Sequence, residues 1–489
     1  MAKRVGVIDI GSNSVRMVVY EKTSRFAFHI LHEIKSPVRL SQDAYKNDGN
    51  LQEIPMQRTF DALKEFLSII SSFKARKTLC VATSCVRDAP NKKDFIYKVK
   101  NKLGLKIKII DGERESYLGA MACANLLPEQ HNALSIDIGG GSSEFSIINQ
   151  KNTTNNISLK LGTVRLKELF FDKEDISGAI KYIDTKLEQL EDFNPSSIIG
   201  IGGTFRALAA AIMAQNNYPF EKLHAYQISA DEFIEFIDKV LNADEKELKH
   251  LGIKKSRFDI IKPGTLILQR IMQMFDIKNL ITSGVGVREG VYLADFLRTS
   301  KDKLPTNYNT SVRYILDLHV ESIAYANQLS KVVKSLFDLT HKYFNLDDKY
   351  RYELAIAAKL FTAGANMHYY SQHKHSYHLL QNTLEFGFTH QQTMLIATLS
   401  RYAGRKSPSA LHVEKYKELL PSKDELNALN YLLSLSIALL SHRPRNIDFV
   451  LEFKDEVLNI KSKNDLYLFS DRVKKLDYKN NLDIKISAP

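Results

Sequence analysis

The sequence of 489 residues contains no tryptophan, three cysteines and no long apolar run. Cys80, Cys85 and Cys123 are too few and too irregularly spaced for a disulfide framework or a zinc site. No apolar stretch approaches the about 20 residues that span a bilayer. The chain enters an apolar strand directly after Met-Ala-Lys-Arg, which leaves no room for a signal peptide. We therefore expect a cytoplasmic protein without a membrane partner.

Composition is otherwise typical of a soluble globular protein, with 44% hydrophobic and 25% charged residues. A chain of this length is too long to fold around a single hydrophobic core, and its length indicates about three domains. The formal net charge of +12 favours an anionic partner but does not choose among nucleic acid, polyphosphate and nucleotide. Because a spread basic excess is usually a solvated surface, charge alone assigns no function.

The most informative stretch is residues 134–148, where an apolar run carrying Asp137 enters a glycine turn and leaves as a second apolar run carrying Glu144. Adjacent glycines remove side chains from the turn, so an anion can approach the backbone N–H groups closely. The turn therefore contributes five candidate phosphate-binding residues: Gly139, Gly140, Gly141, Ser142 and Ser143.

A similar pattern occurs at residues 7–20, and a shift of 128 residues takes Asp9 to Asp137 and Arg16 to Glu144. So long a period indicates two related domains and not a solenoid. Two such hairpins facing each other would line a cleft with amides, hydroxyls and carboxylates, which outlines a phosphate and metal site. The first hairpin adds the phosphate-binding candidates Gly11, Ser12, Asn13 and Ser14.

Further polar loops follow short apolar strands. Arg87 lies beyond the predicted strand 78–82, at the end of a strand where α/β sheets commonly bind ligands. The alternative for Arg87 is a surface cation paired with Asp88. Glycine loops that lead into helices place free N–H groups beside an anion site, although a tight packing turn explains any one of them. These later loops contribute the candidates Arg165, Gly202, Gly203, Thr204, Arg206 and Arg288.

Two acidic residues, Glu113 and Glu115, stand where a helix begins after the predicted strand 106–111. Acidic side chains are common at a helix N-terminus, so capping is the simple explanation for both. Residues two apart project in different directions from a helix. We therefore expect at most one of the two carboxylates to point into a cleft.

The C-terminal part of the chain has a helical pattern almost throughout. Residues 298–310 are polar and predict a linker, and helices are expected beyond it at 311–344, 348–364, 374–383, 388–403 and 424–440. His373, His375 and His378 could form a metal cluster, with His375 and His378 on one helix face. Since no carboxylate stands nearby in sequence, core or surface histidines are the preferred interpretation.

These motifs, in this order across residues 5–298, resemble the exopolyphosphatase/guanosine pentaphosphate phosphatase (Ppx/GppA) family of the actin, sugar kinase and Hsp70-like superfamily. The segments that carry the resemblance are 9–14, 82–88, 112–115, 137–144, 202–204 and 283–290. The resemblance implies an α/β fold with two actin-like (ribonuclease H-like) domains and mixed sheets around a cleft, plus an all-α HD-like C-terminal domain. The expected boundaries are 1–122, 123–298, a linker at 299–310, and 311–489.

The resemblance also implies roles for the acidic residues. Glu115 matches the catalytic base, with Glu113 as the fallback, and Asp137, Glu144 and the Gly139 backbone match positions linked to Mg²⁺, for which Mn²⁺ could substitute. No organic cofactor is expected. The implied reaction is release of terminal orthophosphate from inorganic polyphosphate, with the arginines clamping the following phosphates.

Longer family members append a helical domain that resembles metal-dependent HD phosphohydrolases. The segment that resembles their His-Asp pair has Phe361 and Thr362, neither of which can ligate a metal as that pair would. We therefore expect a catalytically inert domain. Its basic residues would instead extend a groove for a long polyanion; they are Lys374, Arg401, Arg405 and Lys406.

Three alternatives stay open. Removal of the 5′-terminal phosphate of guanosine pentaphosphate, a bacterial stringent-response reaction that yields guanosine tetraphosphate, would use the same catalytic residues. An ATP-dependent kinase of the superfamily would need an adenosine pocket near residues 202–206. A non-catalytic polyphosphate or alarmone sensor would suit the degenerate HD segment but not the intact set of Glu115, Asp137 and Glu144. No nucleic acid partner is expected, and a homodimer is the oligomer that long helical C-terminal domains often form.

Overall fold

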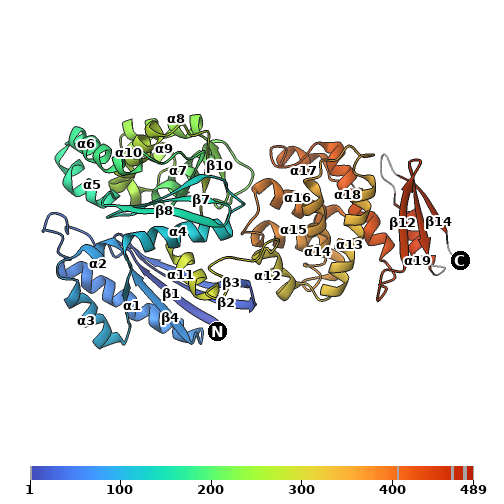
Figure 1. Ribbon diagram of the computed structural model, residues 1–489, viewed down its shortest axis with the longest axis horizontal. Helices are drawn as coiled ribbons and strands as arrows, with labels where there is room; N and C mark the ends of the chain where they lie inside the picture. The colour runs from blue at the N-terminus through green and yellow to red at the C-terminus, as the bar shows by residue number, and fades with distance from the viewer. Residues whose placement is uncertain (1–2, 405–406, 464–466, 477–481, 488–489) are drawn as a thin grey trace. The chain divides into compact units, whose positions relative to one another are not determined.

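The computed structural model describes residues 3–404, 407–463, 467–476 and 482–487. The chain divides into two compact units, Met1–Tyr308 and Asn309–Pro489. The first unit contains two β-sheets with their helices, and the second contains a group of helices followed by a small sheet (Figure 1). Within the described residues, no helix combines the length and hydrophobicity needed to cross a membrane.

The first unit is built on two mixed sheets that repeat one topology. The first has the order β3-β2-β1-β4-β5 and the second the order β8-β7-β6-β9-β11-β10. In each, three antiparallel strands continue into two parallel ones, and the second sheet adds β10, antiparallel to β11, at its edge. The mixed sheets predicted from the sequence are therefore confirmed. The strands are β1 Arg4–Ile10, β2 Val15–Ser24, β3 Ala27–Ser36, β4 Lys77–Ala82, β5 Lys108–Ile109, β6 Ala133–Ile138, β7 Ser143–Asn149, β8 Asn152–Leu159, β9 Ser197–Ile201, β10 Gln227–Ser229 and β11 Asn279–Thr282.

The register of the two glycine hairpins confirms the repeat of 128 residues. Asp9 pairs with Arg16 across β1 and β2, and Asp137 pairs with Glu144 across β6 and β7. Equivalent backbone positions therefore present an acid beside a cation in the first hairpin and two acids in the second.

The turns of the two hairpins also match. The Gly11 N–H donates to the Ser14 carbonyl at 3.2 Å, and the Gly139 N–H donates to the Ser142 carbonyl at 2.9 Å. In both turns the first glycine amide is thus used to close the loop. The amides that follow it are the ones available to a ligand.

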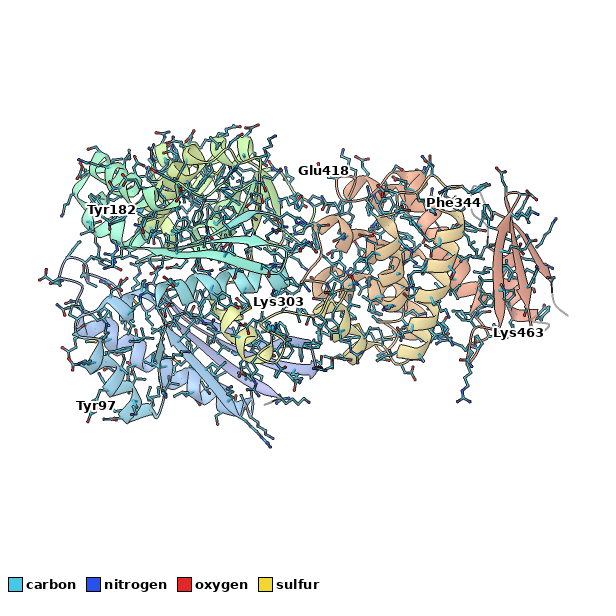
Figure 2. The ribbon with its side chains drawn as sticks, in the orientation of Figure 1. Tyr97, Tyr182, Lys303, Phe344, Glu418 and Lys463 are labelled. Carbon is cyan, nitrogen blue, oxygen red and sulfur yellow. The ribbon has the colours of Figure 1, made fainter. Side chains whose placement is uncertain are left out.

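Helices cover the sheets of the first unit. In α1, the predicted apolar face is confirmed, because Leu63, Phe66 and Ile70 are buried. Gly6 of β1 permits this packing, since a Cβ there would lie 2.7 Å from Cδ1 of Ile70. Outward faces carry exposed side chains such as Tyr97 on α3 (Figure 2). The helices are α1 Glu53–Ser72, α2 Ser84–Asp88, α3 Lys92–Leu103, α4 Gly112–Leu126, α5 Thr163–Leu169, α6 Ile176–Leu187, α7 Gly202–Gln215, α8 Ala230–Asn242, α9 Glu245–His250, α10 Phe258–Met274 and α11 Val287–Phe296, with short 3₁₀ turns η1 Phe171–Lys173, η2 Glu188–Leu190 and η3 Lys255–Arg257.

Several helices start directly at the carboxyl ends of strands. Gly202 has a φ of 86°, a left-handed conformation that favours glycine, and this lets β9 turn at once into α7. In α4, the Asp111 side chain caps the helix by accepting the Arg114 N–H at 2.7 Å. Because these helices begin where strands end, helix N-termini and the carboxyl ends of strands lie at one edge of each sheet. Ligands of α/β folds bind at this edge.

The second unit begins with helices, as predicted, but the long helix expected over 311–344 is wrong. The chain forms α12 Thr310–His319 and then α13 Ile323–Thr340. The break has a local cause, because the Ser322 side chain accepts the Tyr325 N–H and so starts a new helix. The remaining helices are α14 Tyr350–Leu360, η4 Tyr369–Ser371, α15 Gln372–Thr383, α16 His390–Tyr402, α17 Ala410–Lys415, α18 Lys423–Leu439 and α19 Tyr467–Lys474.

The second unit is not all-α, which corrects the expectation of a purely helical domain. Strands β12 Phe449–Lys454, β13 Val457–Ser462 and β14 Asp483–Ser487 form a three-stranded sheet in that order. The β12–β13 hairpin turns at Asp455 and Glu456, both with positive φ. Asn-Gly or Asp-Gly is the usual signal for such a turn, so this hairpin lacks the feature that reveals one in a sequence.

Candidate active site

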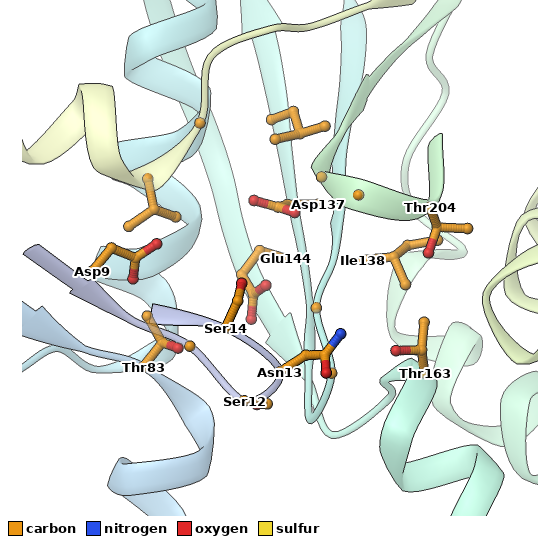
Figure 3. A pocket seen from close by; sticks show the side chains of 18 of the residues that line it. Asp9, Ser12, Asn13, Ser14, Thr83, Asp137, Ile138, Glu144, Thr163 and Thr204 are labelled. Carbon is orange, nitrogen blue, oxygen red and sulfur yellow. The ribbon is translucent and has the colours of Figure 1, made fainter. Parts of the chain in front are cut away.

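The first unit contains a cavity of about 160 Å³. Its lining comes from both glycine hairpins and from segments that follow β4, β9 and β11 (Figure 3). Most lining residues are charged, hydroxyl-bearing or glycine, and the aliphatic ones are Ile138, Ile201, Ile260 and Val287. A lining of this kind suits a small and highly charged ligand.

The tips of the two hairpins meet at the cavity. Ser12 and Gly140 are equivalent positions, and a Cβ added to Gly140 would lie 2.6 Å from the Cβ of Ser12. One added to Gly141 would lie 2.3 Å from Oη of Tyr45 and 2.9 Å from Oγ of Ser84. The three-glycine turn is therefore required by close packing of the tips, independently of any ligand.

Three carboxylates project toward the cavity, Asp9 from β1 and Asp137 and Glu144 from the second hairpin (Figure 3). Burial raises the pKa of Asp9 to about 6, although Arg16 opposes the shift. Burial and the neighbouring Asp137 raise the pKa of Glu144 to about 8. Oδ1 of Asp9 is buried without a hydrogen-bond partner. Such a set of carboxylates is electrostatically suited to a cation.

Glycines and hydroxyls hold two of these carboxylates in place. A Cβ on Gly202 would lie 2.5 Å from Oδ1 of Asp137, so the glycine keeps the space that this carboxylate occupies. Burial raises the pKa of Asp137 as well. Oε1 of Glu144 accepts hydrogen bonds from Oγ of Ser142 at 2.5 Å and Oγ of Ser158 at 2.9 Å. Both acids are thereby fixed at the cavity wall.

Of the two acids at the start of α4, Glu115 lines the cavity and Glu113 is exposed. Nη1 of Arg87 donates to Oε2 of Glu115 at 2.7 Å and to the Ile110 carbonyl at 3.2 Å. Burial, followed by the charge of Glu144, raises the pKa of Glu115 well above its usual range, and Arg87 opposes this shift. Glu115 is thus a buried carboxylate held by an arginine and facing the cavity.

Two arginines predicted to clamp phosphates lie outside the cavity lining and contact protein groups instead. Arg87 binds Glu115. Arg165 donates from Nε to the Gly141 carbonyl at 2.9 Å, and its guanidinium lies 4.4 Å from the ring centroid of Tyr45. These contacts support the hairpin and the helix start and leave the cavity to other cations.

The other two predicted arginines do line the cavity. Arg288 forms ion pairs with Glu289, at 2.6 Å from Nη2 to Oε1, and with Glu33. Arg206 donates from Nε to the Gly202 carbonyl at 3.0 Å, and burial lowers its pKa to about 10. Arg288 is therefore largely neutralised, whereas the charge of Arg206 contacts no carboxylate among the described residues.

Three further cations line the cavity and were not selected from the sequence: Arg16, Lys35 and Arg257. No side-chain hydrogen bond or ion pair joins any of them to another residue in the described part of the chain. The repeat could have drawn attention to Arg16 as the counterpart of Glu144. Lys35 and Arg257 lie outside the glycine hairpins and the loop motifs of the sequence.

A strap formed by residues 37–51, between β3 and α1, reaches from the first sheet to helix α5 beside the second. Oε1 of Glu168 accepts the Asp43 N–H at 2.8 Å, and Oε2 accepts the Tyr45 N–H at 3.1 Å. Lys46 adds an ion pair with Asp172 at 2.8 Å. The strap therefore links the two halves of the first unit beside the hairpin tips.

The cavity brings together most of the predicted site. Lining residues predicted from the sequence are Gly11, Ser12, Asn13, Ser14, Glu115, Asp137, Gly139, Gly140, Ser142, Glu144, Gly202, Gly203, Thr204, Arg206 and Arg288. Gly141, Ser143, Arg87 and Arg165 are not part of the lining, and the Ser143 hydroxyl donates to the Leu161 carbonyl at 2.5 Å. Lining residues with polar or charged side chains that are missing from the predicted set are Asp9, Arg16, Lys35, Thr83, Ser84, Thr163, Arg257 and Glu289.

The carboxylates of the cavity fit a metal ion that is held partly by the protein and partly by a bound phosphate compound. No group of three or more His, Cys, Asp or Glu residues converges as a ready-made metal site anywhere in the described residues. Mg²⁺, however, is commonly bound by one or two carboxylates together with water and substrate phosphates. Asp137 and Glu144, with the unpartnered Oδ1 of Asp9, satisfy that looser requirement.

The second unit offers no comparable site among its described residues. Phe361 follows α14 as a buried residue, and His375 and His378 lie on α15 without forming part of a three-residue metal group. The guanidinium of Arg401 lies 4.7 Å from the Tyr377 ring centroid. Arg405 and Lys406, which were predicted to extend a basic groove, lie outside the described residues.

Comparison with known proteins identifies the class first. The fold of the first unit is similar to the crystal structure of an exopolyphosphatase from Cytophaga hutchinsonii, with a TM-score of 0.56 and 27% identity over 60% of this chain and 97% of that chain. It is also similar to the Aquifex aeolicus member of the Ppx/GppA family, with a TM-score of 0.53 and 28% identity over 63% of this chain and all (100%) of that chain. The fold is thus that of two actin-like domains, as predicted.

The family follows from the sequence. Residues 18–299 match the Ppx/GppA phosphatase family, and residues 309–482 match domain III of the Ppx/GppA phosphatase. The chain therefore belongs to the Ppx/GppA phosphatase family, which confirms the resemblance drawn from its motifs.

One curated relative differs in length. The bifunctional 3-dehydroquinate synthase/phosphatase of Fusobacterium nucleatum is 32% identical over 296 residues, covering 56% of this chain and 44% of the relative. The chain thus spans less than half the length of that protein. This relative supports a phosphatase without naming the phosphate compound.

Proposed function

We propose that the protein is an exopolyphosphatase that releases orthophosphate from the end of inorganic polyphosphate with the help of Mg²⁺. The observation that carries the proposal is a cavity in which the buried carboxylate Glu115 faces the tips of two glycine hairpins. Membership of the Ppx/GppA phosphatase family and the similarity to an exopolyphosphatase structure support the reaction class.

The hairpin turns supply groups for the terminal phosphoryl group. Because Gly11 and Gly139 close their own turns, the amides of Ser12–Ser14 and Gly140–Ser142 and the hydroxyl of Ser14 would hold the phosphoryl oxygens. Holding the phosphoryl group in a fixed position relative to an attacking water is the main contribution a protein makes to phosphoryl transfer.

Asp137 and Glu144 would hold the cation, with Asp9 facing them from the other hairpin. A bound Mg²⁺ supplies neutralisation of phosphate charge and alignment of phosphate oxygens. The two serines that donate to Glu144 would keep its carboxylate oriented. Gly202 would serve the site by leaving room for the carboxylate of Asp137.

Glu115 would accept the proton of the attacking water, and Arg87 would be a positioning residue for it. A carboxylate buried beside Glu144 resists ionisation, and Arg87 favours the ionised form that a base requires. By donating to Oε2 of Glu115, Arg87 would keep this carboxylate ionised and hold it in one orientation. Arg87 is therefore assigned to the base and not to the substrate.

The composition of the cavity favours an inorganic chain over a nucleotide. Its lining is polar, charged or glycine apart from four aliphatic side chains. Pockets for organic ligands are lined predominantly by hydrophobic and aromatic side chains. A guanine base would have to be bound outside this cavity, whereas linked phosphates would be recognised within it.

The test is phosphate release in the presence of Mg²⁺ from long-chain polyphosphate, guanosine pentaphosphate and ATP with sugars, in separate reactions. We expect the highest kcat/KM on polyphosphate. Release from guanosine pentaphosphate alone would show that the protein is a guanosine pentaphosphate phosphatase. Phosphorylation of a sugar would show that it is a kinase. Release from none of the three would refute a phosphoanhydride hydrolase.

Two variants at the start of α4 test the base. We expect Glu115→Gln to lower kcat roughly 10²–10⁴-fold, the range for general base catalysis, while polyphosphate binding is retained. Glu113→Gln removes the same charge from an exposed position and is the matched control, with kcat expected near that of the wild type. If Glu113→Gln is the inactive variant, the roles must be exchanged.

A further inference from the structure

Large side chains are exposed one after another in the second unit, between α14 and α15. Met367, Tyr369 and Tyr370 have exposed fractions of 61%, 68% and 79%, and His368 is exposed as well. The ring centroids of Tyr369 and Tyr370 lie 5.6 Å apart with ring planes at 80°, so the two rings meet edge to face and do not stack on each other. Single exposed apolar side chains are ordinary, but a contiguous group of them marks an interaction site.

The loop that follows α18 brings arginines to the same unit. Gln328 on α13 fixes this loop, because its Nε2 donates to the Pro444 and Arg445 carbonyls at 3.1 and 2.8 Å. One turn earlier on α13, the ring of Tyr325 lies beneath the guanidinium of Arg443, at 3.6 Å from the ring centroid. Arg443 is nevertheless exposed. Its planar group is thus held on an aromatic ring with its outer side open to solvent.

The electrostatic environment of Tyr325 relates the two loops to α19. Burial raises the pKa of Tyr325, Arg443 and Arg472 of α19 oppose this shift, and Tyr369 adds to it. Because charge interactions weaken with distance, side chains that act on one hydroxyl lie near it. We call the resulting surface the tyrosine–arginine patch, which consists of Met367, Tyr369, Tyr370, Arg443, Arg445 and Arg472.

The tyrosine–arginine patch carries positive charge without counterions. Arg443, Arg445 and Arg472 are exposed, and none of them forms an ion pair or a side-chain hydrogen bond within the described ranges of the chain. A second copy of the chain is disfavoured as the occupant, because a two-fold contact through this patch would bring two sets of arginines together. The charge therefore requires an anionic partner, and the open rings require one with flat apolar faces.

We propose that the tyrosine–arginine patch binds single-stranded nucleic acid. Bases stack on Tyr369 and Tyr370, since every base has a π-face, and the arginines hold the phosphates between them. Polyphosphate and acidic peptides would supply the charge but not the rings that cover the tyrosines. The sequence led to no such expectation, because the residues come from three separate segments. This site is independent of the proposed hydrolase.

The test is fluorescence anisotropy of a labelled oligoadenylate of about 12 nucleotides, titrated with the full chain. We expect Tyr370→Ala to weaken binding roughly 10-fold or more, which is within the range for one stacked base. Arg443→Gln should reduce the slope of log affinity against log salt by about 0.7, the value for one phosphate contact of a single strand. The same strand paired with oligouridylate should bind more weakly, because its bases already stack within the duplex.

Matched variants exclude a general effect of exposed side chains. Tyr97 on α3 of the first unit has an exposed fraction of 70%, and Tyr97→Ala should leave binding unchanged. Arg76→Gln removes an exposed arginine between α1 and β4 and should leave the salt slope unchanged. Tyr370→Phe keeps the ring and should retain most of the affinity. If Tyr97→Ala weakens binding as much as Tyr370→Ala, the strand binds elsewhere and the proposal is wrong.

Competition distinguishes the other occupants. Polyphosphate and polyglutamate should displace the oligomer poorly, and equally well from the wild type and from Tyr370→Ala. Displacement that is lost in Tyr370→Ala would show that a charged chain without bases occupies the patch, and it would overturn the proposal. Displacement by adenosine monophosphate at concentrations near that of the protein would overturn it in favour of a free nucleotide.

Two further measurements complete the test. A wild-type dimer that dissociates in Tyr370→Ala, measured by analytical ultracentrifugation, would show that the patch is an interface between copies, against the proposal. Phosphate release from short polyphosphate should be the same in Tyr370→Ala and in the wild type. Absence of phosphate release from every substrate would refute the hydrolase and leave the nucleic-acid site standing, whereas an oligomer affinity that Tyr370→Ala does not change would refute the nucleic-acid site alone.

Discussion

The β1–β2 hairpin and the β6–β7 hairpin share their register and the hydrogen bond that closes the turn, but they differ in charge. Across the first sheet, the acid of β1 is followed by Arg16 and Lys35; across the second, the acid of β6 is followed by Glu144 and Ser158. One backbone thus offers cations on one side of the cavity and acids on the other. The duplicated frame therefore has the charges that the proposed phosphate anion and its Mg²⁺ counterion require.

The largest effect should come from the acidic side. Glu144→Gln removes a proposed cation ligand while keeping the acceptor oxygen for its serines. We expect kcat on polyphosphate to fall on the order of 10³-fold, because several kcal/mol of charge stabilisation in the transition state are lost. Mg²⁺ binding measured by calorimetry in the presence of imidodiphosphate should weaken in the same variant.

The mirror variant in the first hairpin is Arg16→Gln, and it should behave differently. It should raise KM for polyphosphate and leave Mg²⁺ affinity nearly unchanged. If both variants lose Mg²⁺ binding to the same extent, or if only Arg16→Gln does, the assignment of one hairpin to the anion and the other to the cation is wrong.

An intermediate effect is expected beside Asp137. In the first sheet Asp9 is in register with Val81 of β4, which Ala82 follows, whereas in the second sheet Asp137 is in register with Ile201 of β9, which Gly202 follows. Gly202→Ala would place an alanine after β9, as Ala82 stands in the corresponding position of the first sheet. Its φ of 86° costs an alanine about 1–2 kcal/mol, and the new Cβ would lie 2.5 Å from Oδ1 of Asp137.

We therefore expect Gly202→Ala to lower Tm by a few degrees and kcat/KM roughly 10-fold, through displacement of the carboxylate. Gly104→Ala is the matched control, since Gly104 also has positive φ, at 66°, and its Cβ would meet nothing within 4 Å. That variant should show the loss in Tm alone. A full loss of activity in the control would mean that backbone strain, and not Asp137, explains the effect.

The sequence predicted one side of this comparison better than the other. Glu115, Asp137 and Glu144 were found because each stands in a short motif with glycines or at a helix start. Lys35 was missed because it reaches the cavity through its register with β2, and Arg257 because it comes from a 3₁₀ turn near α10. A local sequence pattern shows neither the register between two strands nor which turn packs against a distant cavity.

The same limit explains the errors in the fold. The repeat predicted two related domains because their hairpins share a pattern over many residues. The break between α12 and α13 depends on one serine cap, and the β12–β13 hairpin depends on a turn without glycine or asparagine. For Arg87 and Arg165, which were predicted to clamp phosphates, only the packed structure reveals their protein partners.

The smallest expected effect concerns the strap that joins the two sides. Glu168 accepts two backbone N–H groups of the strap, and a glutamine can offer only one oxygen where the carboxylate offers two. Glu168→Gln should therefore weaken the docked strap by about 1 kcal/mol. Hydrogen exchange at the Asp43 and Tyr45 amides should become several-fold faster, with a modest rise in KM.

Exposed Glu65 on α1 provides the control, and Glu65→Gln should leave exchange at both strap amides unchanged. Because the strap lies against the hairpin tips through Tyr45 and Gly141, loosening it should affect substrate retention more than the chemical step. Faster exchange with an unchanged KM would show that the two charged sides keep their spacing without the strap. In that case the contact between Ser12 and Gly140 alone would set the distance across which the anion and its counterion meet.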